Sequence, residues 1–241
     1  MSERSDSVDG DPRRARDLHT LAPGWTIAEV LHDEDFDDAD LSDWRWELEQ
    51  GGSVRMIEGV LDIEVPAGAT VWFTHELEGP LLIEYDALSV KEGGPNDRVS
   101  DLNCFWMARD ARSPDDIFAT ERSGRFADYN QLLTYYVGLG GNRNTTTRFR
   151  RYIGDPDHRP MLPEHDLDDA EHMLSPNTWQ TVQLIAAGGL IRYARDGRVL
   201  FVLRDDHPYT SGWFAIRTTY SHLRIDHLRI SRLAPVKGPG R

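Results

Sequence analysis

Cysteine is almost absent from this sequence, because Cys104 is the single one among 241 residues. An intramolecular disulfide is therefore excluded, which fits a reducing compartment. Cys104 lies in the apolar run Leu102–Ala108, where a buried, inert thiol is expected. An apolar signal-peptide region is missing from residues 1–18, and no apolar run is long enough to span a bilayer. These absences predict a cytoplasmic protein without a membrane partner.

Lysine is also scarce, and Lys91 and Lys237 are the two present among 27 basic residues. The 41 acidic residues outnumber the basic ones, and the formal net charge is -14. Such a charge argues against nucleic acid or an anionic membrane as the main partner. It leaves room for a local cationic pocket, which would have to be built from arginine.

Metal-binding motifs are missing as well. There is no C-x-x-C or H-E-x-x-H, and the histidines at 158, 165 and 172 do not have the spacing of zinc ligands. No cofactor is expected to be required. A structural Ca²⁺ would use oxygen ligands, and the candidates are Asp35, Asp37 and Asp226. The alternative is that these three are ordinary surface acids in an acidic chain.

Long amphipathic helices are not predicted, and short alternating strands dominate instead. The clearest pair is Leu190–Ala194 and Arg198–Leu203, joined by Asp196-Gly197 as a type I′ hairpin turn. In the last strand, His222–Arg232, the apolar residues change phase, which predicts a β-bulge near Asp226–His227. The pattern indicates an antiparallel β-sandwich of the jelly-roll type.

The length suits one large all-β domain. We expect a disordered polar tail over residues 1–20, a jelly-roll domain over 21–234 and a flexible tail over 235–241. Two long irregular segments, Ser113–Asn130 and Gly154–Asn177, interrupt the strands. Loops of this length in one domain are usually functional lids or insertions.

The stretch from 142 to 152, NRNTTTRFRRY, carries the strongest functional signal. In a strand, Thr146, Arg148, Arg150 and Tyr152 share one face. Unpaired arginines are costly to bury, and a guanidinium binds a carboxylate or phosphate with two parallel hydrogen bonds. We interpret this face as the floor of a site for an anionic ligand. An exposed strand with solubilising arginines is the alternative.

Several motifs together resemble a known family. They are Phe36-Asp37-Asp38, Gly59–Ile63, Asp101–Ala108, Arg125–Tyr129, Tyr135–Tyr152, Gly212-Trp213-Phe214 and Ile225–Ile230. Residues 25–233 resemble the YesU-like proteins of bacterial rhamnogalacturonan-utilisation operons and, more distantly, the 3-keto-disaccharide hydrolase domain. Both belong to the concanavalin A-like lectin/glucanase superfamily. The resemblance implies a jelly roll and a carbohydrate ligand, and it identifies no catalytic residue.

The residue types in the central motifs favour β-elimination from a uronic acid. That reaction needs cationic or amide groups at the sugar carboxylate, a base for the C5 proton and an acid for the leaving oxygen. Arg148 and Arg150 are candidate clamps, and Asn103 is a candidate amide donor.

The candidate acids and bases are aromatic or imidazole side chains, and further polar and aromatic groups are candidates for binding. For acid or base we select Tyr135, Tyr136, Tyr152 and His172, and for binding also Trp106, Trp213 and Asn144. Tyr135 and Tyr136 point to opposite faces of a strand, so at most one of them lines a given cleft. The alternatives are structural: core tyrosine and tryptophan, and a solvated loop histidine.

Hydrolysis by two carboxylates is the competing chemistry. The motif-rich centre offers Asp101, Glu121 and Asp128, which do not form a pair on one strand face. We therefore expect a carbohydrate-active enzyme that cleaves an acidic oligosaccharide by elimination. The alternatives are action on a 3-keto-glycoside and a lectin-like module that binds sugar without turnover.

Overall fold

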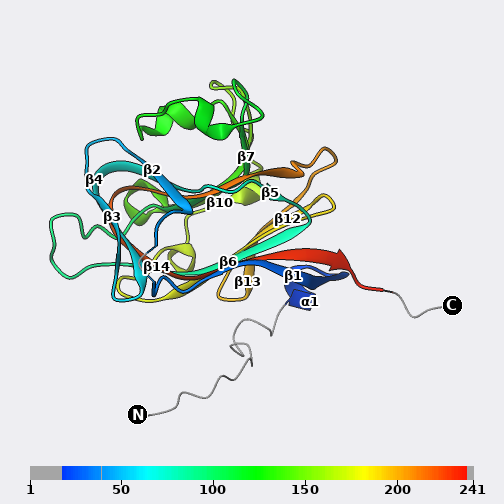
Figure 1. Cartoon of the computed structure of the whole chain (residues 1–241), viewed down its shortest axis with the longest axis horizontal. Coiled ribbons are helices and arrows are strands. Elements are labelled where there is room, and N and C mark those ends of the chain that lie inside the picture. Colours follow the sequence, from blue (N-terminus) through cyan, green and yellow to red (C-terminus); the bar gives the residue numbers. More distant parts are fainter. Residues whose placement is uncertain (1–17, 39, 238–241) are drawn as a thin grey trace, which may run out of the picture.

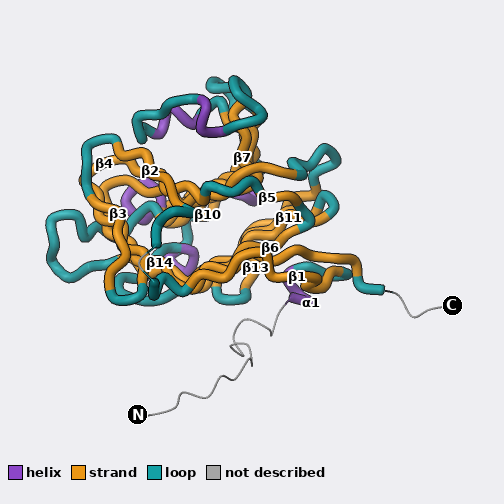
Figure 2. Tube along the Cα trace, in the orientation of Figure 1, coloured by secondary structure: helices purple, strands orange, loops and turns teal. Residues whose placement is uncertain are grey.

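The regular secondary structure is almost entirely β, as the computed structural model shows for residues 18–38 and 40–237, which are the residues described (Figures 1 and 2). The strands are β1 (Trp25–Glu34), β2 (Trp44–Leu48), β3 (Ser53–Ile57), β4 (Val60–Phe73), β5 (Leu77–Glu78), β6 (Leu81–Ser89), β7 (Leu102–Asp110), β8 (Leu132–Gly140), β9 (Thr146–Ile153), β10 (Asp166–Leu167), β11 (Gln180–Ala187), β12 (Leu190–Arg195), β13 (Arg198–Arg204) and β14 (Ser211–Pro235). The helical elements are α1 (Leu18–Leu21), α2 (Gly141–Asn144) and the 3₁₀ turns η1 (Ile117–Ala119), η2 (Phe126–Tyr129), η3 (Pro163–His165) and η4 (Ala170–His172).

Strand β14 joins the two layers of the sandwich. The strand order is β10-β9-β8-β7-β14-β6-β11-β12-β13, and the first part of β14 pairs with β7 while its later part pairs with β6 and β1. The change occurs at Tyr220, which has a left-handed φ of 45°, and the register with β4 shifts at the same place. The sheet therefore curls back on itself, which gives the antiparallel β-sandwich that the alternation predicts.

Alternation sorts the side chains of β7 and β8 onto two faces. One face contributes Cys104, Trp106, Tyr135 and Val137 to the main core between the layers. The other face contributes Phe105 and, with other residues, forms a second apolar cluster outside the sandwich. This outer face also holds the polar positions of the same strands, so it is where a ligand site can form.

The local predictions in the last third of the chain are confirmed. Asp196 and Gly197 have φ values of 54° and 76°, as a type I′ turn between β12 and β13 requires. The register of β14 with β6 shifts between Asp226 and Arg229, and His227 has a φ of 51°. This irregularity is the predicted β-bulge.

Most of the two expected tails lies outside the described residues. Within the described part, α1 begins at Leu18 and β14 continues to Pro235, so regular structure reaches into both expected tail ranges. No helix among the described residues is long and apolar enough to cross a membrane.

The first long irregular segment, Ser113–Asn130, is fastened to the outer face by a buried arginine. Arg122 Nη1 lies 3.0 Å from Asp110 Oδ2, and Arg122 Nε lies 3.1 Å from Glu47 Oε1. The Tyr129 hydroxyl donates to Glu47 at 2.6 Å. Because these carboxylates compensate the buried guanidinium, the segment is held in place as a fixed wall.

A second polar cluster holds the loop that leads into β7. His222 Nε2 lies 2.7 Å from Asp62 Oδ2, and its Nδ1 lies 3.0 Å from Asp97 Oδ1. Hydrogen bonds and charge from Asp62 and Asp97 raise the pKa of His222. Burial works against the ionised forms of Asp62 and Asp97, but hydrogen bonds and nearby positive charge outweigh it and lower both pKa values.

We predict that Arg122→Met destabilises the protein by about 3–5 kcal/mol, because Asp110 and Glu47 then lose a buried cationic partner. Chemical denaturation monitored by tryptophan fluorescence measures this change. Arg232→Met removes an exposed arginine and is the matched control, with an expected change below about 0.5 kcal/mol. Equal effects of the two substitutions would contradict a structural role of Arg122.

We also predict a pH dependence of stability from His222. Its raised pKa means that its contribution is complete below the ordinary value of 6.5 and is lost as the pH rises through the folded-state pKa. The contributions of Asp62 and Asp97 are present above 3.8 and are lost as the pH falls below that value. The difference in unfolding free energy between the wild type and His222→Gln should therefore be largest between these pH values and shrink above 6.5. A difference that stays constant from acid to alkaline pH would refute this assignment.

Candidate functional site

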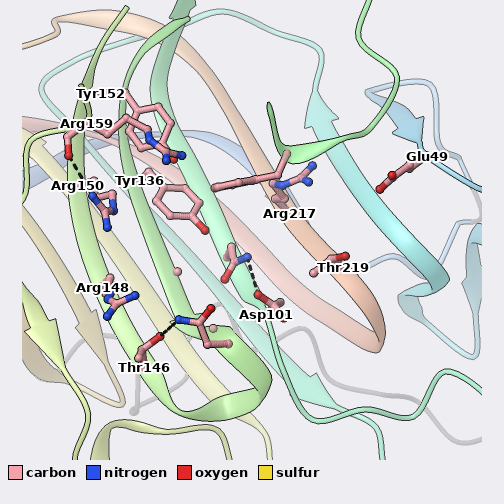
Figure 3. A pocket seen from close by; sticks show the side chains of 15 residues that line it. Glu49, Asp101, Tyr136, Thr146, Arg148, Arg150, Tyr152, Arg159, Arg217 and Thr219 are labelled. Atoms are coloured by element: carbon pink, nitrogen blue, oxygen red, sulfur yellow. Dashed lines mark hydrogen bonds between the residues drawn. The ribbon is translucent and has the colours of Figure 1, made fainter. Parts of the chain in front are cut away.

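A cavity of about 410 Å³ opens on the outer face of the sheet formed by β7, β8, β9 and β14 (Figure 3). Its size falls within the roughly 300–1,000 Å³ of small-molecule sites. The lining is mostly polar: Glu49, Asp101, Asn103, Phe126, Tyr136, Gly138, Gly141, Asn142, Thr146, Arg148, Arg150, Tyr152, Arg159, Arg217 and Thr219.

Strand register places the central side chains in two adjacent rows. Asn103 of β7 pairs with Arg217 of β14 on one side and with Gly138 of β8 on the other. In the next row Tyr136 pairs with Arg150 of β9. By the alternation of side chains along each strand, all these residues project from the outer face, and side chains that are distant in the sequence therefore meet here.

Gly138 makes room for the tyrosine. A Cβ atom at this position would lie 2.9 Å from the Tyr136 hydroxyl oxygen. Any side chain at 138 would therefore displace the ring, so glycine is needed for Tyr136 to lie along the cavity floor.

Three arginines give the cavity its positive charge. Among the described residues, Arg150, Arg159 and Arg217 have no carboxylate at salt-bridge distance, in contrast to most other arginines of this chain. Arg217 is 2% exposed, and its Nη1 donates to Thr70 Oγ1 at 2.7 Å and to the Gly124 carbonyl at 3.0 Å. These acceptors are neutral, so Arg217 has no direct ion pair among the described residues, and its charge acts at longer range on Asp101, whose ionised form it favours.

Aromatic rings support these guanidinium groups. Arg217 lies 4.6 Å from the ring centroid of Tyr129 and 5.0 Å from that of Phe126, both in η2. Arg159 lies 5.8 Å from Phe126 and 5.7 Å from Tyr152. Cation–π contacts fix the positions of the arginines while leaving their N–H groups able to donate elsewhere.

Arg148 was predicted to bind an anionic ligand, but in the structure it is paired with an acid of the protein itself. It lines the cavity, but its Nε and Nη2 donate to the two carboxylate oxygens of Asp166 at 2.7 and 3.1 Å. The cause is the short strand β10, which pairs Asp166 directly with Arg148. Arg150 instead donates to the Arg159 carbonyl at 3.0 Å, so Arg150 is the better candidate for an anionic ligand.

The two tyrosines of the cavity are held in the neutral form. Burial raises the pKa of Tyr136 and of Tyr152, and for Tyr152 the positive charge of Arg159 opposes the rise only in part. The Tyr152 hydroxyl and the side-chain amide oxygen Oδ1 of Asn103 are buried without a hydrogen-bond partner among the described residues. Such groups lose hydrogen-bond energy unless a ligand or water satisfies them.

Asp101 is the buried carboxylate of the site. Its φ is 61°, and its Oδ2 accepts hydrogen bonds from Arg98 Nη2 at 2.9 Å and from the Ser100 hydroxyl. Asn103 donates to Oδ1 at 3.4 Å. Burial raises the pKa of Asp101 more than these donors lower it. A carboxylate of this kind is a stronger base than one in water.

Sequence reasoning missed Arg159, Arg217 and Phe126, and it noted Asp101 without giving it a role. Arg217 carried a signal, because it alternates with Ile216 and Thr218 in the final long strand. Arg159 and Phe126 come from irregular segments, and nothing in the local pattern indicates which way they point.

Other predicted residues lie away from the cavity. Tyr135 and Trp106 are in the main core, where their rings are 5.5 Å apart, and the Tyr135 hydroxyl donates to Asp205. The expectation that only one tyrosine of the 135/136 pair lines the cleft is confirmed. His172 also lies away from the cavity. Its backbone carbonyl accepts a hydrogen bond from the Thr147 hydroxyl, and Thr147 projects from the face of β9 opposite to that of Arg148.

Trp213 and Asn144 have structural contacts. Trp213 shares the outer face but packs against Phe118, and its Nε1 donates to the Thr74 carbonyl at 3.2 Å. The side chain of Asn144 accepts from the Leu174 N–H at 2.8 Å and donates to the Leu174 carbonyl at 2.9 Å, which fastens the turn before β9.

The candidate calcium ligands are not part of a group of three or more potential ligands among the described residues. Asp35 accepts from the backbone N–H of Asp37 in the loop after β1, whereas Asp226 lies beside His227 in β14. In the part of the chain that the structure describes, no group of three or more His, Cys, Asp or Glu side chains could hold a metal ion.

Solved structures with the same fold include enzymes and binding domains. A protein of unknown function with a galectin-like fold from Bacillus subtilis matches with a TM-score of 0.69 and 16% identity, over 88% of this chain and 100% of that one. β-Agarase A from Zobellia galactanivorans matches with a TM-score of 0.57 and 12% identity, over 88% and 94%. The carbohydrate recognition domain of Emp46p matches with a TM-score of 0.53 and 16% identity, over 86% and 97%. The fold is thus the single-domain, concanavalin A-like or galectin-like jelly roll that the sequence predicts.

No curated protein is significantly similar to this chain in sequence. A family model does match, over residues 63–228, which include β6 to β13, most of β14 and the strands that build the cavity floor. The chain therefore belongs to the family described as a domain of unknown function, DUF6250.

Proposed function

We propose that this protein is a carbohydrate-active enzyme that binds an acidic, uronic-acid-containing oligosaccharide and cleaves it by β-elimination. The observation that carries the proposal is the cluster of Arg150, Arg159 and Arg217, which lacks carboxylate partners among the described residues in a chain of net charge -14. Arginines that lack a direct ion pair attract a carboxylate and bind it with charge-assisted hydrogen bonds. The fold, which is shared with a β-agarase and a carbohydrate recognition domain, supports a glycan as the ligand.

The cavity contains a group for each step of an elimination. Arg150 and Arg217 neutralise the sugar carboxylate, so that negative charge can accumulate at C5. Asp101 removes the C5 proton, the electron pair forms the C4=C5 double bond, and the C4–O bond breaks. Tyr136 is protonated at neutral pH and donates its proton to the leaving oxygen. The buried acceptor of Asn103 binds a sugar hydroxyl.

We also propose that the chain is related to the YesU-like proteins and that it acts in the cytoplasm on imported oligosaccharides. The resemblance of the motifs between 101 and 152 supports this relation. Action on a 3-keto-glycoside fits the same arrangement, because a ketone at C3 also makes a neighbouring C–H acidic.

A sugar-binding module without turnover is the second candidate. Its support is that both cavity tyrosines have raised pKa values, so neither is poised as a base. In that case Asp101 would position Arg98 and Asn103 and would take no proton from the ligand.

We expect Arg150→Gln to weaken the binding of uronate oligosaccharides about 10- to 100-fold, the effect of losing one charged hydrogen bond. The melting temperature should change little, because the Arg150 side chain makes one hydrogen bond to a carbonyl and no ion pair among the described residues. Isothermal titration calorimetry measures the affinity. Arg232→Gln is the control with unchanged affinity, and equal losses of affinity and stability in Arg150→Gln would make this arginine structural.

Turnover is tested by the ultraviolet absorbance of unsaturated uronate products over a panel of uronic-acid oligosaccharides. We expect Asp101→Asn to abolish product formation while retaining binding. Ser100→Ala removes a hydrogen bond that favours the ionised form of Asp101, so the acid limb of the pH–rate profile should move to higher pH.

Two results would contradict the elimination mechanism. One is binding of a uronate panel without any rise in absorbance, which favours the module. The other is an acid limb that does not move in Ser100→Ala, which removes Asp101 as the base.

A further inference from the structure

A second cavity, of about 470 Å³, adjoins the first. The two cavities are lined by residues that are neighbours in the sequence: Gly141, Asn142, Thr219 and Asp101 line the first, and Arg143, Asn144, Tyr220 and Arg98 line the second. Arg98 lies between them, since its Nη2 donates both to Asp101 Oδ2 at 2.9 Å and to the Thr219 carbonyl at 2.7 Å. The two cavities are therefore parts of one surface, separated by an arginine–aspartate pair.

The second cavity is also cationic. Lys91, Arg98 and Arg143 line it, and within residues 18–38 and 40–237 neither Lys91 nor Arg143 has a carboxylate at salt-bridge distance. Asp97 is the acid of this cavity, and it is already occupied by His222 and by the backbone N–H groups of Glu92 and Gly94. The uncompensated charge on this surface is thus positive, as in the first cavity.

An exposed aromatic ring borders the second cavity. Tyr220 is 43% exposed, although it occupies the point where β14 changes layers, and its φ of 45° is unusual for a bulky side chain. The guanidinium of Arg98 lies 4.9 Å from its ring centroid. A tyrosine held in this way offers a flat apolar surface and a polar hydroxyl, which suits a sugar ring.

The turn shared by the cavities is strained. Asn142, Arg143 and Asn144 have φ values of 53°, 64° and 62°, so three consecutive residues are left-handed. Asparagine tolerates this conformation, so the cost of about 1–2 kcal/mol applies to Arg143. The paired hydrogen bonds of Asn144 with Leu174 hold the turn. Such strain is concentrated at ligand-binding segments, and here it directs Arg143 to the second cavity.

We propose that the second cavity is a subsite for a further acidic sugar residue of the same oligosaccharide. One uronate residue occupies the first cavity and its neighbour occupies the second, where Lys91 and Arg143 bind its carboxylate and Tyr220 supports its ring. The linkage between the two residues then crosses the Arg98–Asp101 pair, beside the proposed base. This inference rests on the proposed acidic-oligosaccharide ligand and adds a minimum length to it.

The test compares galacturonate and glucuronate mono-, di- and trisaccharides by isothermal titration calorimetry. In the wild type, the disaccharide should bind at least about tenfold more tightly than the monosaccharide. The double variant Lys91→Gln/Arg143→Asn should lose this gain and keep the monosaccharide affinity. Asparagine is chosen because it tolerates a left-handed backbone. Arg150→Gln should weaken the mono- and disaccharides alike.

Lys237→Gln/Arg232→Gln removes the same charge at the far end of the chain and should retain the full gain. If the Lys91→Gln/Arg143→Asn variant also retains it, the subsite is refuted while the first cavity stands. If no uronate of any length binds to the wild type, the proposed function falls and the subsite falls with it.

Discussion

The compensation of buried positive charge is the constraint on which this structure depends. Arg122 and Arg217 are both buried on the outer face of the same sheet. Arg122 is neutralised by Glu47 and Asp110, and its role is to hold the Ser113–Asn130 segment. Arg217 has neutral oxygens and aromatic rings around it instead. The charge of Arg217 acts on Asp101 at longer range, and the cavity beside Arg217 admits an anion or water that can complete the environment of its guanidinium.

The sequence predicts which face of β9 lines the site, but it does not predict which arginine on that face is ion-paired. Parity within a strand is a local property, so the grouping of Thr146, Arg148, Arg150 and Tyr152 could be read from eleven letters, and the structure confirms that all four line the cavity. The partner of Arg148 comes from β10, which has two residues and no recognisable pattern. Its pairing depends on the path of a long irregular segment, which local periodicity does not encode.

The difference between a local sequence pattern and tertiary contacts also explains why some predicted site residues lie away from the cavity. His172 and Trp106 have chemistry suited to a sugar site, but burial in the main core or behind the opposite face of β9 decides what they can touch. Residue type alone cannot predict this. The cavity also draws on β14, whose Arg217 is more than sixty positions from β9, and only the complete strand order brings the two together. The jelly roll itself was predictable, because many short strands and tight turns each carry a local signature.

The same jelly-roll fold occurs in a β-agarase and in a carbohydrate recognition domain, so the fold leaves the choice between catalysis and recognition to the site. What distinguishes the present cavity is the combination of uncompensated arginines with one buried carboxylate and one neutral tyrosine hydroxyl. A surface that only binds an acidic sugar needs the arginines but neither the carboxylate nor the tyrosine hydroxyl. The additional feature is the buried Asp101 carboxylate, which lines the cavity and contacts Asn103, and it supplies the base that the proposed reaction needs.

The central position of β14 has a consequence for the order in which this protein becomes functional. The strand is the last in the sequence, yet it lies between β6 and β7 and carries Arg217. Before β14 is made, β6 and β7 each have an unpaired edge and β1, β4 and β5 also lack this partner, and hydrogen-bonding groups on such edges promote aggregation. A chain that lacks β14 would therefore have neither a closed sandwich nor the complete cavity, because this one strand both joins the layers and supplies Arg217 and Thr219.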